Sequence, residues 1–127
     1  MPLVRISMST GRSPEARRKI ADAVHQALVE TISIPAADRF QIITESQAGD
    51  FVYDPEYLNI SRSSALTMIQ IVISTGRSVE IKKALYQRIA DLLSMQAGVR
   101  KEDVLINLVE VAKENWSFGN GVAQYAP

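Results

Sequence analysis

The sequence predicts an α/β (α+β) fold in which two tandem β-α-β units form a four-stranded sheet with two helices on one face. An internal repeat is the first observation behind this prediction, since Ser-Thr-Gly-Arg-Ser stands at residues 9–13 and again, 65 residues later, at 74–78. The second observation is that the segments before both copies alternate in hydrophobicity with a period of two, which is typical of strands. Self-similarity at one offset indicates a duplicated unit. The units span 2–45 and 68–111 of a single domain.

The first unit reads as strand, helix and strand. Residues 2–8 alternate in hydrophobicity, as expected of a half-buried strand. Ser13 is then a typical N-cap and Pro14 a typical first helical residue, so a helix is predicted over 14–33. Residues 39–45 are the returning strand. Because a helical connection of this length makes a parallel pair with a right-handed crossover, the two strands are expected to lie in one sheet.

The second unit repeats these signals. A strand is predicted over 68–74, Ser78 takes the N-cap position, and a helix follows over 79–96. Gly98 is a typical C-terminal stop, and residues 104–111 are the last strand. Both helices are expected to cover the apolar positions on one sheet face, namely Val4, Ile6, Ile69 and Ile71.

The other sheet face also carries apolar side chains, among them Leu3, Val72, Leu105 and Val109. Parallel strands are normally covered on both faces, and the chain has no third layer to supply. At about 25 cal/mol per Å² of apolar area, an uncovered face forfeits substantial stabilisation. We therefore expect a homo-oligomer that buries this second face.

Two segments lie outside the repeat. The connector, residues 46–67, is long for a loop but rich in aromatic and aliphatic residues, so local structure with a short helical turn at 54–57 is expected. The tail, residues 112–127, is aromatic and contains the closely spaced Gly119 and Gly121. It is expected to form a hairpin that packs against a neighbour.

The composition argues against several classes of function. The 14 basic and 14 acidic residues cancel, which disfavours nucleic acid or an anionic membrane as the main partner. There is no Cys, and the single His25 leaves no cluster for a transition metal, so no cofactor or metal is expected; a carboxylate-only Mg²⁺ site stays open without an acidic cluster to indicate it. No apolar run approaches the ~18 residues of a membrane span, and the N-terminus lacks signal-peptide features, so a cytoplasmic protein is expected.

Pro2 is the residue with the most distinctive chemistry. If Met1 is removed, Pro2 carries a free secondary amine that can act as a base, a cationic acid or a nucleophile. An α-amine titrates near pKa ~8; an apolar pocket or a nearby cation lowers that value, and a nearby carboxylate raises it. Proline is also tolerated as the first residue of a strand, so a purely structural role is the alternative.

Four features stand in order along the chain: Met-Pro opening a strand, a duplicated Gly-Arg-Ser between strand and helix, Asp38 before the second strand, and Trp-Ser-Phe-Gly-Asn-Gly at 116–121. This set resembles the tautomerase superfamily over essentially the whole chain. The stretches Ala-Asp-Arg-Phe-Gln-Ile at 37–42 and Asn-Trp-Ser-Phe-Gly at 115–119 look most like the malonate semialdehyde decarboxylase group. The resemblance implies the tautomerase fold and, for a fused two-unit chain, a homotrimer with pockets near the subunit boundaries.

The resemblance also implies which residues act. In the decarboxylase group these are the terminal proline, an aspartate and two arginines, which implies Pro2, Asp38 and Arg77 as catalytic residues. The second arginine of that group falls on Thr75, a departure that weakens any claim to the decarboxylase's own substrate. The residues implied in substrate binding are Arg12, Thr75, Trp116, Phe118 and Tyr125.

Residue chemistry alone leaves alternatives open at these positions. Arg77 can bind a carboxylate or carbonyl oxygen by paired N–H groups, but its position also suits a helix-end arginine, and Arg12 also reads as a solvated residue. Asp38 can position water, hold the proline amine in its charged form, or cap a turn, as expected for Asp103. The tail aromatics can exclude water from a site or simply pack an interface.

Three functions follow from these patterns. The leading one is keto-enol tautomerisation of a small 2-oxo or enol acid by a neutral Pro2 amine that carries a proton between carbon and oxygen. The second is decarboxylation or hydration of the malonate semialdehyde type by a cationic Pro2 or an iminium formed from it. Asp38 favours the cation, whereas Arg77 and the aromatic residues favour the neutral form, so the sequence does not decide between them. The third is a non-catalytic binding or scaffold protein, which a retained Met1 would favour.

Overall fold

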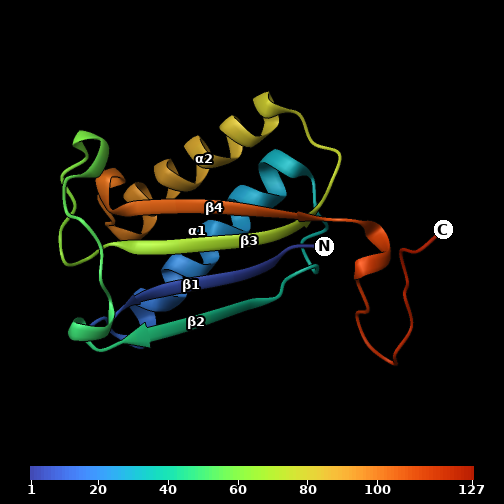
Figure 1. Cartoon of the computed structure of the whole chain (residues 1–127), viewed down its shortest axis with the longest axis horizontal. Helices are drawn as coiled ribbons and strands as arrows, with labels where there is room; N and C mark the ends of the chain where they lie inside the picture. The colour runs from blue at the N-terminus through green and yellow to red at the C-terminus, as the bar shows by residue number, and fades with distance from the viewer.

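The computed structural model describes the whole chain, residues 1–127, as a four-stranded sheet with two helices packed on one face (Figure 1). The strand order is β2-β1-β3-β4, with β1 parallel to β2, β3 parallel to β4, and the two units joined where β1 pairs antiparallel with β3. The predicted fold of two tandem β-α-β units is confirmed. The elements are β1 Leu3–Ser9, α1 Pro14–Ile32, β2 Gln41–Ser46, β3 Thr67–Ser74, α2 Val79–Ala97 and β4 Val104–Val111.

Both helices begin where the duplicated motif places them. Ser13 Oγ accepts a hydrogen bond from the N–H of Ala16 at 3.1 Å, and Ser78 Oγ accepts one from the N–H of Ile81 at 3.2 Å. Each serine therefore satisfies one of the free N–H groups of a first helical turn, as predicted. Neither helix carries an apolar stretch long enough to cross a membrane.

Glycines shape the turn that precedes each helix. Gly11 and Gly76 have φ angles of 127° and 122°, a conformation that is strained for residues with a Cβ atom. Gly98 ends α2 in the left-handed region, with φ at 65°, as the sequence predicts. In the repeated Gly-Arg-Ser, the glycine thus permits the backbone conformation of the turn, and the serine caps the helix that follows.

The core lies between the helices and the sheet. β1 and β3 bury Val4, Ile6, Ile69 and Ile71 beneath the helices, as predicted. Aliphatic side chains of both helices and both central strands form one continuous buried cluster. The two units therefore share a single core and do not form separate domains.

No element of the chain covers the opposite sheet face. Leu105 and Val109 of β4 are 39% and 38% exposed, and Leu3 and Val72 are half-buried. The register places Leu3 beside Val72, and Val72 beside Val109. Leu3, Val72 and Val109 therefore form an apolar row across three strands, with Leu105 further along β4, on the face where the sequence predicts an oligomer interface.

The connector packs against the end of the sheet that lies away from the N-terminus (Figure 1). Two short 3₁₀ turns, Ala48–Asp50 and Tyr57–Asn59, give it local structure, so the helical turn expected at 54–57 forms slightly later in the chain. Asp103, which is 1% exposed, accepts hydrogen bonds from the backbone N–H and the hydroxyl of Ser63. Asp103 therefore anchors the connector and does more than end a turn.

The tail turns back on itself without forming paired strands. A 3₁₀ turn at Lys113–Asn115 follows β4, and the rest of the tail is irregular. The Gln124 side chain closes the loop, because its Oε1 accepts from the N–H of Phe118 at 2.9 Å and its Nε2 donates to the carbonyl of Gly119 at 3.1 Å. The expected β-hairpin is wrong in this respect: side-chain bonds from Gln124 take the place of a backbone ladder.

Candidate active site

The register of the parallel strands β1 and β2 brings the N-terminus to Asp38. Val4 pairs with Gln41, and its N–H donates to the carbonyl of Phe40 at 3.0 Å. The same register followed back toward the N-terminus places Met1 beside Asp38, which lies in the turn between α1 and β2. There the Met1 amine forms an ion pair with the Asp38 carboxylate, a side chain that is only 13% exposed.

Burial and nearby charges act in opposite directions on this amine. Partial burial and, after it, the positive charge of Arg77 lower the pKa of the Met1 amine from 8.0 to about 6. Asp38 opposes this shift, because a carboxylate in contact favours the charged amine. Pro2 follows in the chain and is buried. Its nitrogen lies within one residue, about 3.5 Å, of the Met1 amine and thus near the same two charged groups.

Ser74 joins three parts of the site. It is the last residue of β3 and is 1% exposed. Its hydroxyl accepts a hydrogen bond from the indole Nε1 of Trp116 at 3.1 Å and lies 3.3 Å from the sulfur of Met1. Its carbonyl oxygen accepts a hydrogen bond from Nη1 of Arg77 at 2.9 Å. Ser74 thereby holds the tail and the arginine next to the N-terminus.

The tail supplies an aromatic wall. The rings of Trp116 and Phe118 stack with their centroids 5.3 Å apart. Phe118 also contacts Phe40 at 5.9 Å and meets Tyr125 edge-on at 5.2 Å. Aromatic side chains beside a site limit the access of water, which strengthens electrostatic interactions nearby, and this wall borders a space of the size that small ligands occupy. This cavity, of about 410 Å³, is lined by Leu3, Phe40, Val72, Trp116 and Phe118 among others.

Within one chain, Arg12 lies away from the Met1 amine, Asp38 and Arg77, at the opposite end of the sheet. Because β1 and β3 are antiparallel, the residues that follow them lie at opposite ends of the sheet. Nη2 of Arg12 donates to the carbonyl of Ala65 in the connector at 2.7 Å. Burial lowers the pKa of Arg12, and the charge of Asp103 raises it. Arg12 thus lies beside the connector and Asp103, at the end of the sheet opposite Arg77.

Thr75 lies in the loop that leads from β3 to Arg77. It is exposed, and its N–H donates to the carbonyl of Val111 at 3.0 Å. Thr75 offers a hydroxyl group, and no charge, where the resemblance implies a second arginine. The site therefore has Arg77 as its nearby cation together with the N-terminal amine.

Two residues of the site are absent from the sequence predictions. Ser74 stands three residues before Arg77, inside the repeated motif, but serines at strand ends are too common to single it out. Phe40 stands two residues after Asp38, and its ring joins the aromatic wall only because the tail returns to it. Neither residue carries a local signal, since both depend on where the tail lies.

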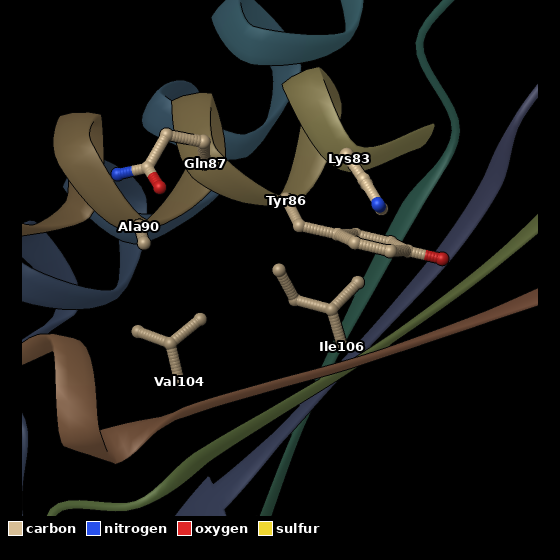
Figure 2. A pocket seen from close by; sticks show the side chains of 6 residues that line it. All are labelled: Lys83, Tyr86, Gln87, Ala90, Val104 and Ile106. Carbon is tan, nitrogen blue, oxygen red and sulfur yellow. The ribbon is translucent and has the colours of Figure 1, made fainter. Parts of the chain in front are cut away.

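A second, larger cavity lies away from these residues. It has a volume of about 520 Å³ and lies between α2 and β4, where the ring of Tyr86 lies beside Ile106 and the amine of Lys83 points toward that ring (Figure 2). None of the residues implied in catalysis lines it. The corresponding cavity of the first unit is lined in part by Arg39, whose Nη2 donates to Asp22 at 2.6 Å. No group of three or more side chains arranged to hold a metal ion is present in the chain.

Comparison with known proteins identifies the family. Two protein-family models, each described as a tautomerase enzyme, match residues 38–119 and 2–60. The chain belongs to the tautomerase superfamily. It is 43% identical over 124 residues to the probable tautomerase YusQ of Bacillus subtilis (strain 168), a match that covers 98% of both chains.

Solved structures of tautomerase-superfamily proteins have the same fold. FG41 malonate semialdehyde decarboxylase, inhibited by 3-bromopropiolate, is 43% identical with a TM-score of 0.92 over 97% of this chain and 93% of that one. A malonate semialdehyde decarboxylase studied for its decarboxylase and hydratase activities is 32% identical with a TM-score of 0.92, over 97% and 95%. A fused 4-OT solved as a symmetric trimer is 26% identical with a TM-score of 0.79, over 97% of both chains. The chain is therefore similar to the malonate semialdehyde decarboxylases within its superfamily.

Proposed function

We propose that the chain, with Pro2 as its N-terminal residue, is an enzyme that interconverts the keto and enol forms of a small 2-oxo acid. The observation that supports this most strongly is the convergence of an N-terminal amine, the Asp38 carboxylate and the Arg77 charge beside an aromatic cavity. In this proposal Pro2 carries the proton, Asp38 orients the amine, and Arg77 binds an oxygen of the substrate.

The neutral amine of Pro2 is the reactive group. Its nitrogen takes the proton from one end of the oxo-enol system and returns it to the other end. Burial and the charge of Arg77 lower the pKa of the amine at this place in the site, to about 6 where the amine is that of Met1. In the proposal, the same burial and the same Arg77 charge favour the neutral form of the Pro2 amine. A pKa close to the working pH also suits a group that must both accept and release a proton.

Arg77 and the aromatic wall bind different parts of the substrate. One N–H of Arg77 goes to the carbonyl of Ser74, which leaves others for a carboxylate or carbonyl oxygen of the substrate. Trp116 and Phe118 face the apolar remainder, where a ring of the substrate gains from aromatic contact. In the proposal, Thr75 and Tyr125 also contact the substrate: Thr75 stands two residues before Arg77, and Tyr125 meets Phe118 edge-on.

Decarboxylation of malonate semialdehyde, or hydration of an unsaturated oxo acid, is the second candidate. The ion pair between the Met1 amine and Asp38 favours it, because a carboxylate stabilises the cationic amine that these reactions need. The 43% identity to FG41 malonate semialdehyde decarboxylase also favours it, whereas the uncharged Thr75 does not. Release of carbon dioxide from malonate semialdehyde would distinguish this reaction from tautomerisation.

Replacement of Pro2 tests the proposed function. In protein shown by mass spectrometry to lack Met1, Pro2→Ala is expected to abolish turnover of phenylenolpyruvate. Arg77→Ala is expected to lower kcat/KM by about 10²–10³-fold, as for loss of a group that stabilises developing negative charge. Arg12→Ala, the same change at the repeated position, should stay within a few-fold of the wild type. Undiminished turnover by Pro2→Ala would contradict the role of Pro2, and a wild-type protein without turnover would favour a non-catalytic binding or scaffold role.

The active form is proposed to be a homotrimer. The apolar row of Leu3, Val72 and Val109, together with Leu105, lies on a face that no element of the chain covers, and burial of such a row in a symmetric assembly is favourable. The fused 4-OT that shares this fold is a symmetric trimer. The cavity behind Trp116 opens beside Leu3 and Val72, so a neighbouring copy would close one of its sides.

A further inference from the structure

We propose that the Ser74 hydroxyl donates a hydrogen bond to an oxygen of the substrate, beside the N-terminal amine. The proposal deepens the proposed function and rests on it, because the place of that oxygen is free only when Met1 is absent. Ser74 is 1% exposed, and the reaction proposed for Pro2 and Arg77 gives its hydroxyl no part.

The direction of the Ser74 proton follows from its partner. The indole Nε1 of Trp116 can only donate, so the hydrogen bond of 3.1 Å between it and Ser74 Oγ uses an acceptor lone pair of the serine. The one hydroxyl proton of Ser74 is therefore left for another partner. In the structure that partner is the sulfur of Met1, at 3.3 Å.

A thioether sulfur is a weak acceptor, and it leaves with Met1. A buried hydroxyl is normally hydrogen-bonded, so the processed site holds a donor aimed at the space that the Met1 side chain occupies. A carboxylate or carbonyl oxygen placed there would accept a stronger bond than sulfur does. Such an oxygen is what the substrate class of the proposed function supplies.

Arg77 converges on the same place. Its Nη1 donates to the backbone carbonyl of Ser74 at 2.9 Å, and its charge acts on the amine of Met1. Ser74, at the end of β3, thus carries the hydroxyl and also fixes the Arg77 guanidinium beside it through its backbone carbonyl. Together they form a pair of donors, one charged and one neutral, for the oxygens of an oxo acid.

The repeat offers a matched control. Ser9 is the counterpart of Ser74 and ends β1, which runs antiparallel to β3, so it lies at the opposite end of the sheet. Ser9 is only partly buried, whereas Ser74 is fully buried. The change Ser9→Ala removes the same atom from the same repeat position without altering the proposed site.

The test measures binding and turnover separately, with protein that lacks Met1. Calorimetric titration with phenylpyruvate gives Kd, and phenylenolpyruvate turnover gives kcat/KM. Ser74→Ala is expected to weaken binding and to lower kcat/KM by about 10–100-fold, the usual effect of losing a hydrogen bond to a charged group. Ser74→Cys keeps the size and a weaker donor and is expected to fall between Ser74→Ala and the wild type. Ser9→Ala should stay within twofold.

The same changes in a Trp116→Phe background separate contact from positioning. If Ser74 acts only by holding Trp116, Ser74→Ala will have no further effect in that background, and the proposal is overturned. A persistent loss of about tenfold or more supports a direct contact. If Ser74→Ala fails to fold, as judged from its melting temperature, wild-type binding by Ser74→Cys overturns the proposal.

The outcomes also distinguish this inference from the proposed function. Phenylpyruvate binding that depends on Ser74, in a protein without turnover, would overturn the proposed function and leave the contact standing. Turnover that depends on Pro2 but is unchanged in Ser74→Ala would do the reverse. A wild-type protein that does not bind phenylpyruvate at all would overturn the contact.

Discussion

The carboxylate of Asp103 holds Ser63 by two hydrogen bonds, one from the backbone N–H at 2.7 Å and one from the hydroxyl at 2.6 Å. Asp38, its counterpart in the first unit, instead faces the amine of Met1. The arginine of each unit lies near the aspartate of the other unit, because the charge of Arg12 interacts with Asp103 and that of Arg77 with the Met1 amine beside Asp38. One repeat position thus anchors the connector at one end of the sheet and faces the candidate active site at the other.

Asp103→Ala is expected to lower the free energy of unfolding by about 3 kcal/mol, because two donors of Ser63 lose a buried charged acceptor. Urea denaturation measures this change. Asp38→Ala, the matched variant, is expected to lower the free energy of unfolding by less, about 1 kcal/mol, because the Met1 amine left without its partner can lose its proton and so avoid an unpaired buried charge. Similar losses for the two variants would contradict the different roles assigned to the two aspartates.

Arg77→Ala is expected to raise the pKa of the Met1 amine in a chain that retains Met1. The charge of Arg77 disfavours the protonated amine, so its removal moves the pKa from about 6 back toward 8.0. NMR titration of the ¹⁵N-labelled amine measures the shift. Arg12→Ala should leave the pKa unchanged, because Arg12 lies at the far end of the sheet, and a shift of equal size there would contradict the assignment.

The stability of the chain that retains Met1 is expected to rise between pH 6 and pH 8. The folded amine loses its proton near 6 and the unfolded amine near 8.0, so the unfolded state binds more protons in this window. The free energy of unfolding therefore increases with pH there. Urea midpoints at the two pH values test this against an N-acetylated chain, which has no titrating amine. An equal slope in both proteins would show that the amine does not contribute.

Phe118→Ala is expected to loosen the tail. Phe118 contacts Phe40, Trp116 and Tyr125, and each aromatic pair contributes about 0.5–1.5 kcal/mol beyond its buried area. Loss of these contacts should increase the fraction of molecules with an open tail, and hence the rate at which a protease cleaves the tail, at least about tenfold. KM should rise as well, because the cavity loses part of its wall. The exposed Val122→Ala is the control and should be cleaved at the wild-type rate.

Val109→Asp is expected to dissociate the oligomer. A charge at the β4 end of the apolar row cannot be buried against a second copy without a partner, and burial of an unpaired charge is strongly unfavourable. Light scattering after gel filtration should show a mass near that of a single chain. Met95→Asp, on an exposed part of α2, should leave the mass unchanged, and a variant Val109→Asp with the wild-type mass would place the interface elsewhere.

Much of the fold is predictable from local patterns, because the same helix-start and strand patterns occur in both units. Ser13 and Ser78 mark the helix starts, and the alternation of β1 and β3 marks their buried faces. The position of Arg12 is different, since the repeat does not reveal that the units meet through antiparallel strands. That pairing sends Arg12 to the end of the sheet opposite Arg77.

The candidate site was only partly predictable for a related reason. Pro2, Asp38 and Arg77 come from the resemblance, and the parallel register then explains why the first two lie together. Ser74 and the closure of the tail by Gln124 depend on long-range side-chain bonds, which no periodicity encodes. A β-hairpin was expected from two glycines, whereas the amide of Gln124 provides the bonds that close the turn.

The most direct test compares two forms of the same chain, one that begins at Pro2 and one that retains Met1, each verified by mass. In the second form the Pro2 nitrogen is part of a peptide bond and cannot carry a proton between carbon and oxygen. If Pro2 is the catalytic group, the form that begins at Pro2 will turn over phenylenolpyruvate and the form with Met1 will not. Equal turnover by the two forms would contradict the role of the N-terminal proline.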